Sequence, residues 1–228
     1  MKQDMTLPEN NLRVKEAESG DWKIEKFEIV EDMSMTIFNM RSAGRSVVPG
    51  WYWKLKHGST VVMSNTPAEI RDHRVFICKA QGNVLINGLG LGVINEILLA
   101  KPEVEHITVV EASEDVIKLT GVHYENEPRV TIVHDDAFEY KPPKGVRYNA
   151  VWNDIWNDIC SDNLEDMKRL HRKYGRKADW IGSWCRYECE RQWRENQKWE
   201  RQWNMFRPSP KLEEAAKKLQ EDSNGIKL

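Results

Sequence analysis

The sequence predicts an α/β fold with a mostly parallel sheet, a small N-terminal β unit and a C-terminal amphipathic helix. Two observations carry the prediction. Short apolar runs alternate with helical patterns, as is typical of parallel strands buried on both faces; the runs are 83–87, 106–110, 129–133, 149–153 and 180–184. Before them, residues 22–30 alternate between apolar and charged residues, which predicts a half-exposed strand.

The composition is that of a globular protein, with 40% hydrophobic and 31% charged residues among 228. No run is apolar and long enough to cross a bilayer, and residues 1–10 lack the layout of a secretory signal, so we expect a cytoplasmic protein without membrane contact. The four cysteines form no Cys-x-x-Cys pair, so no metal site is predicted. The formal net charge of −2 argues against a nucleic-acid partner.

Three units follow from the order of the patterns. Residues 1–64 are expected to form the N-terminal β unit, 65–185 the α/β domain and 186–228 a helical extension. Within the first unit, about 20 polar residues that we expect to be loosely ordered precede strands at 22–30, 34–40, 51–55 and 60–63.

Two capping boxes are predicted at helix starts. Thr66 with Glu69, and Pro67 at the first helical position, should begin a helix that runs to about Lys79. Asp162 with Glu165 should begin another, which ends at Gly175. Helices are also expected between the glycines and Ala100, and from Ser113 onwards.

The C-terminal extension is predicted to be mainly helical. Residues 186–206 form a strongly amphipathic pattern. Its tryptophans are interpreted as a packing face that covers the edge of the sheet. A last short helix is expected at 211–221. The aromatic and apolar residues of the face are Cys189, Trp193, Trp199, Trp203 and Phe206.

A glycine-rich turn follows the first strand of the α/β domain, in Asn87-Gly88-Leu89-Gly90-Leu91-Gly92. Glycines let the backbone turn sharply and let a ligand lie against bare peptide at a helix N-terminus. A dinucleotide fingerprint requires Gly-x-Gly-x-x-Gly, and its last position is Val93 here. This disfavours a nicotinamide or flavin site.

Polar residues end the next three strands, where ligands of open α/β sheets bind. Glu111, followed by Ala112, stands about 20 residues beyond the glycines, where a carboxylate can accept hydrogen bonds from ribose hydroxyls. After the third strand, a carboxylate of the pair Asp135-Asp136, which Ala137 follows, can accept from an adenine amino group. The fourth strand ends in Asn153-Asp154.

Over roughly residues 60–185 the sequence resembles class I S-adenosylmethionine-dependent methyltransferases, and within them most nearly the spermidine synthase-like branch. The glycine spacing resembles their motif I, Asp136-Ala137-Phe138 their aspartate-small-aromatic group, and Asp154 the catalytic aspartate after the fourth strand. A more distant similarity to guanidinoacetate methyltransferase-like enzymes lies in the Thr66-Pro67 helix start. The resemblance implies a Rossmann-like fold, S-adenosylmethionine as cofactor, and a cofactor site formed by Asn87, Gly88, Leu89, Gly90, Gly92, Glu111, Ala112, Asp135, Asp136, Ala137 and Asn153.

The sequence departs from the family at two places. Asn87 replaces the acid that commonly precedes the glycines, and Asp154 is followed by Trp156 and Asp158 rather than by a Ser-Ser-Asp-type run. We therefore expect methyl transfer to a small molecule or an amine-type side chain, with Asp154 orienting or deprotonating the acceptor. Trp152 or Trp156 is considered as a cation-π partner, with core packing as the alternative.

Three other hypotheses of function are consistent with the sequence. One is a spermidine synthase-like aminopropyltransferase. A second is a non-catalytic binding or assembly module that uses the tryptophan-rich helix as its partner surface. A homo-oligomer is also possible on the sequence alone. The third is a nucleic-acid methyltransferase guided by 168–177, which holds six Lys or Arg residues and no acid.

Overall fold

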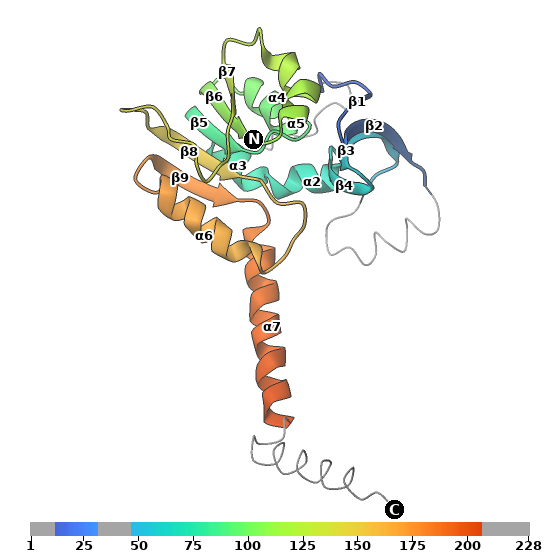
Figure 1. Cartoon of the computed structure of the whole chain (residues 1–228), viewed down its shortest axis with the longest axis vertical. Helices are drawn as coiled ribbons and strands as arrows, with labels where there is room; N and C mark the ends of the chain where they lie inside the picture. The colour runs from blue at the N-terminus through green and yellow to red at the C-terminus, as the bar shows by residue number, and fades with distance from the viewer. Residues whose placement is uncertain (1–11, 32–46, 207–228) are drawn as a thin grey trace, which may run out of the picture.

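The computed structural model describes residues 12–31 and 47–206. An entirely parallel five-stranded sheet forms its centre, in the order β7-β6-β5-β8-β9 (Figure 1). The predicted α/β class is confirmed, and each predicted strand lies within two residues of the observed one. The strands are β5 (Gly82–Asn87), β6 (Val104–Glu111), β7 (Val130–His134), β8 (Tyr148–Asn153) and β9 (Ala178–Ser183).

A separate antiparallel sheet of four strands, β1-β2-β3-β4, precedes it. Its strands are β1 (Ala17–Ser19), β2 (Trp22–Ile29), β3 (Gly50–His57) and β4 (Thr60–Ser64). The sequence does not predict β1, because three residues are too few to show a periodicity of two. The strand predicted at 34–40 lies outside the described residues, as does the helix at 211–221.

Helices cover both faces of the parallel sheet. On one face, α3, α4 and α5 share a core with the strands, which includes Phe76, Leu98 and Val116. On the other face, α6 supplies Leu170 and Tyr174, both fully buried. The helices are α2 (Pro67–Asp72), α3 (Arg74–Lys79), α4 (Val93–Leu99), α5 (Glu114–Leu119), the 3₁₀ turn η1 (Gly121–Tyr124) and α6 (Asn163–Tyr174).

The helix predicted between Pro67 and Lys79 is two short helices that meet at His73. The Thr66–Glu69 capping box does not form. Glu69 instead accepts hydrogen bonds from the backbone N–H and the hydroxyl of Ser64, at 2.6 and 2.7 Å. These bonds hold β4 to the start of α2, and they position the N-terminal sheet against the α/β domain.

The second predicted capping box is also wrong. Asp162 has helical backbone angles, whereas a side-chain cap needs an extended residue at the N-cap position, and its side chain makes no cap hydrogen bond. Ser113 is extended, and its hydroxyl accepts from the N–H of Val116 at 3.3 Å. The predicted start at Ser113 and the predicted end at Gly175 are both confirmed.

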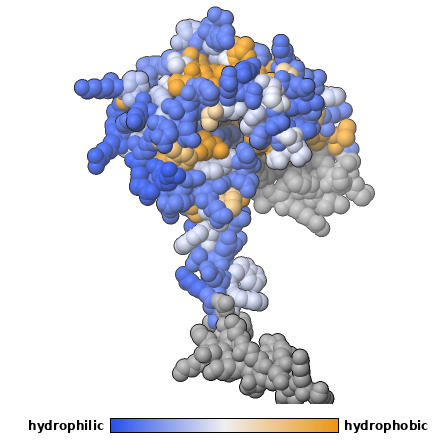
Figure 2. Space-filling view, viewed as in Figure 1, coloured by the Kyte–Doolittle hydropathy of each residue, from blue (hydrophilic) through white to orange (hydrophobic). Residues whose placement is uncertain are grey.

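Helix α7 (Arg186–Phe206) projects from the body of the molecule as a stem (Figure 1). Cys189 is buried against α6, but Trp199 and Trp203 are 72% and 74% exposed. The predicted packing face is thus wrong for the outer half of the helix, which points away from the sheet edge that it was expected to cover. In Figure 2 most of the stem is coloured hydrophilic to neutral. No described helix is long and apolar enough to span a membrane.

Candidate active site

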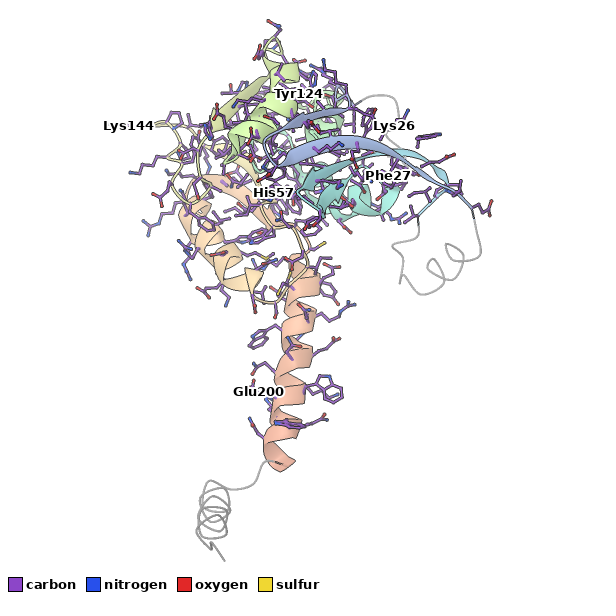
Figure 3. All side chains as sticks on the ribbon, turned by 45° about the vertical axis from the view of Figure 1, so that its right-hand side comes forward. Lys26, Phe27, His57, Tyr124, Lys144 and Glu200 are labelled. Carbon is purple, nitrogen blue, oxygen red and sulfur yellow. The ribbon has the colours of Figure 1, made fainter. Side chains whose placement is uncertain are left out.

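A cavity of about 680 Å³ lies between the N-terminal sheet and the carboxyl ends of the parallel strands. Trp22, His57 and Met63 line it from the N-terminal sheet, and the glycine turn lines it from the α/β domain. His57 lies near the middle of the molecule, far from Glu200 on the stem (Figure 3). The site therefore sits where ligands of open α/β sheets bind, with a second wall supplied by residues that precede the sheet in the chain.

The glycine turn after β5 is tightly packed. A Cβ on Gly88 would lie 2.0 Å from the backbone oxygen of Asp154, and the φ angle of Gly88 is +102°. Only glycine allows β5 and β8 to end this close together. At Gly90 the space is taken by the Met63 sulfur, which accepts a hydrogen bond from the N–H of Leu91 at 3.2 Å. The turn thus supports both the sheet edge and the docking of β4.

Glu111 ends β6 beside the turn. Its two carboxylate oxygens accept from the backbone N–H groups of Leu89 and Ser113, both at 2.8 Å. A carboxylate has about four acceptor positions, so two remain for a ligand in the cavity. Asp136, after β7, also lines the cavity and accepts from the N–H of Phe138. Both carboxylates are held by backbone donors, which fixes their orientation.

Asp154 follows β8 on the same wall. Its side chain is 23% exposed, and no described residue donates a hydrogen bond to its carboxylate. Burial, and after it the negative charges of Glu69 and Asp72, raise the pKa of Asp154 to about 7. His73 Nδ1 is 3.8 Å from Asp154 Oδ2. Burial lowers the pKa of His73 to about 3, so this imidazole is neutral and the contact is no ion pair.

The charge of the cavity has one sign. The lining residues of the described chain include four carboxylates and neither Lys nor Arg; the acids are Glu69, Glu111, Asp136 and Asp154. Aromatic side chains stand among them, including the stacked pair Trp22 and His57, with ring centroids 4.5 Å apart. Such a cavity suits a cationic ligand with apolar parts, and it repels a phosphate.

The structure brings most of the predicted site residues together. The cavity is lined by Gly88, Leu89, Gly90, Glu111, Ala112, Asp136, Ala137 and Asp154. Four predicted cofactor residues lie outside its lining. Asn87 and Asn153 are fully buried and hydrogen-bonded to each other at 2.7 Å, Gly92 packs against the Tyr124 hydroxyl, and Asp135 accepts from the N–H of Asp136. The side chains of strand-terminal residues alternate in direction, so neighbours in the sequence cannot all face one cavity.

Only one of the two candidate tryptophans lines the cavity. Trp152 is 3% exposed and stacks against both Phe76 and Trp180, at 5.2 and 6.2 Å between ring centroids, so it packs in the core. Trp156, in the loop after β8, lines the cavity.

Sequence reasoning missed the wall formed by Met63, Glu69 and His73. The sequence predicts Glu69 as a capping residue, and His73 carries no pattern that predicts a break between two helices. Their signal is tertiary, because Met63 depends on β4 docking against the glycine turn and His73 on the junction of α2 and α3 docking against β8.

No protein-family model matches the sequence, and neither does any curated protein. Solved methyltransferase structures are similar in fold. An S-adenosylmethionine-dependent methyltransferase from Clostridium acetobutylicum is 12% identical (TM-score 0.34, covering 48% of this chain and 43% of that one). A putative RNA methyltransferase from Pyrococcus horikoshii is 15% identical (0.39, 52% and 58%). A methyltransferase from Streptomyces caelestis is 20% identical (0.34, 45% and 43%).

The chain thus covers 43–58% of the length of these structures. With TM-scores this low, the function has to follow from the geometry of the site. That geometry is an α/β sheet whose strand ends form an acidic cavity beside a glycine turn.

Proposed function

We propose that the chain is an S-adenosylmethionine-dependent methyltransferase that acts on an amine-type acceptor, either a small molecule or an exposed side chain. One observation carries the proposal. The Asp154 carboxylate, which no described residue supplies with a hydrogen-bond donor, lies on the same cavity wall as the glycine turn. A largely buried carboxylate in this state favours a proton, or an N–H group or cation of a ligand.

The part of the cavity beside the glycine turn, here called the cofactor half, fits a nucleoside with a cationic tail. Gly88 and Gly90 expose bare backbone, Glu111 keeps acceptor positions for ribose hydroxyls, and Asp136 is placed to accept from an adenine amino group. Bound S-adenosylmethionine would supply an electrophilic methyl group on a positively charged sulfur. The four lining carboxylates favour that charge. Asn87 is sealed in the core, so the amino-acid end of the cofactor would need other partners.

The part of the cavity around Asp154, here called the acceptor half, is also lined by Glu69 and Trp156. Near neutral pH a substantial fraction of Asp154 is ionised and can take a proton from an ammonium acceptor, which frees the nitrogen lone pair. With S-adenosylmethionine bound, that lone pair would form the new N–C bond while the C–S bond breaks with its electron pair going to sulfur, and Asp154 would hold the proton. Trp156 offers an aromatic surface to the cationic acceptor.

Calorimetry tests the cofactor half. S-Adenosylhomocysteine, S-adenosylmethionine and decarboxylated S-adenosylmethionine are titrated into the wild-type chain, Gly88→Ala and Gly145→Ala. Gly145 also has a positive φ, but a Cβ there meets nothing within 4 Å. We expect the wild type and Gly145→Ala to bind, with at least a tenfold loss in Gly88→Ala. If no adenosyl compound binds at millimolar concentration, the proposal is wrong. Tighter binding of the decarboxylated form would favour aminopropyl transfer instead.

Transfer of labelled methyl groups to a panel of primary and secondary amines tests the acceptor half. Asp154→Asn should lower kcat/KM by roughly 10²–10⁴-fold, as expected for loss of a general base. Its affinity for S-adenosylhomocysteine should stay near that of the wild type, because Asp154 belongs to the acceptor half. Equal activity of Asp154→Asn and wild type would remove Asp154 from the proposed mechanism.

A further inference from the structure

Trp152 connects the aromatic stack of the core to the candidate base. Its indole Nε1–H donates to His73 Nδ1 at 3.2 Å, and the two rings meet edge to face at 5.8 Å. An indole nitrogen is a donor only, so Nδ1 must be the accepting nitrogen. Since burial keeps the ring neutral, the single proton of His73 lies on Nε2.

The same Nδ1 atom is the part of His73 that faces Asp154, at 3.8 Å from Oδ2. The bond from Trp152 therefore turns a nitrogen without a proton towards the carboxylate. The charged groups around Asp154 act in the same direction. Glu69 and Asp72 approach from α2, and Glu111 and Asp136 line the cavity from the ends of β6 and β7. Of these four acids, Glu69 and Asp72 raise the pKa of Asp154.

We propose that Trp152 is a positioning residue whose indole N–H locks His73 in the Nε2–H tautomer, so that His73 cannot donate to Asp154 and Asp154 keeps its proton affinity. Without the lock, His73 is free to carry its proton on Nδ1 and donate to the carboxylate. That hydrogen bond would stabilise the ionised form and make Asp154 a weaker base. A general base works best when its pKa is near the working pH, so the lock serves the acceptor half of the site.

The chain offers a matched pair of variants. Trp152→Phe removes the indole N–H and keeps an aromatic ring beside Phe76 and Trp180. Trp180→Phe makes the same change in the same stack, but the Trp180 indole donates to no described residue. A loss of packing therefore affects both variants, whereas a loss of the lock affects only Trp152→Phe.

Two measurements read the lock in the protein without any ligand. Nitrogen NMR of labelled histidine reports which nitrogen of His73 carries the proton, and carboxyl-carbon NMR follows the titration of Asp154, assigned with Asp154→Asn. We expect the Nε2–H tautomer in wild type and Trp180→Phe, and the Nδ1–H tautomer in Trp152→Phe. The midpoint of Asp154 should fall by about one pH unit or more in Trp152→Phe. An unchanged midpoint, or an equal fall in both variants, overturns the proposal.

His73→Asn is a second route that leaves Trp152 intact. Its amide oxygen can accept from the indole while its NH₂ group faces Asp154, so the midpoint should fall here too; an unchanged midpoint counts against the lock. The role of Asp154 as base rests on the proposed function, but these titrations do not. Lowered midpoints in a chain that methylates nothing would keep the lock and refute the proposed function. In an active enzyme, the acid limb of the kcat/KM profile should move with the midpoint.

Discussion

At the scale of single residues, Asp154 makes the stability of the fold depend on pH. Its pKa is about 7 in the folded chain and near 4 when unfolded, so between these values the folded state binds more protons. The free energy of unfolding should therefore fall as the pH rises from 4 to 7. Asp154→Asn should lack this fall and be more stable at pH 8 by on the order of 2–4 kcal/mol. Urea unfolding of the wild type and Asp154→Asn at pH 4 and pH 8 checks this prediction. A gain in stability of Asp154→Asn over the wild type that grows towards low pH would contradict it.

Two glycines of the turn should differ in what an added methyl group costs. In Gly88→Ala the new Cβ meets the backbone of Asp154, which cannot move without separating β5 from β8. In Gly90→Ala it meets the flexible end of Met63, so the cost is mainly the left-handed conformation, about 1–2 kcal/mol. Thermal unfolding should rank wild type above Gly90→Ala, and Gly90→Ala above Gly88→Ala. The reverse order of the two variants would show that Met63 cannot yield.

At the scale of elements, α6 and the outer half of α7 make opposite predictions. Leu170 on α6 is completely buried, so Leu170→Ala should lower the free energy of unfolding by about 2–5 kcal/mol. Trp199 and Trp203 on α7 are largely exposed. Changing both to serine should therefore alter the free energy of unfolding by less than about 0.5 kcal/mol. A large loss in the double variant would show that this face is covered in solution.

At the scale of the whole molecule, the cavity depends on two sheets that are distant in the sequence. Val61, Val62 and Met63 line one wall, and Gly88 to Gly90 line the other. Bound S-adenosylhomocysteine should therefore slow amide hydrogen exchange in β4 as well as in the turn after β5. Mass spectrometry of peptides from both regions measures this. Protection confined to the α/β domain would exclude the N-terminal sheet from the binding site.

Much of the site could be predicted because its signals are local. Strand periodicity, the glycine spacing and the acids at strand ends each occupy a few neighbouring residues, and a parallel sheet brings all strand ends to one edge. The five parallel strands, the start at Ser113 and the gathering of Gly88, Glu111, Asp136 and Asp154 follow from this. The predicted cap at Glu69 failed because Ser64, from another element, competes for the same carboxylate.

The sequence by itself thus determined the fold class, the edge of the sheet that carries the site, and the acids placed there. Only the tertiary structure decided which neighbours face the cavity, because the partner of a side chain depends on which elements dock. In the folded chain Asn87 and Trp152 are buried in the core and His73 lies beside Asp154. Trp199 and Trp203 are exposed on a projecting helix. Local patterns specify elements, whereas burial and hydrogen-bond partners arise from contacts between residues far apart in the chain.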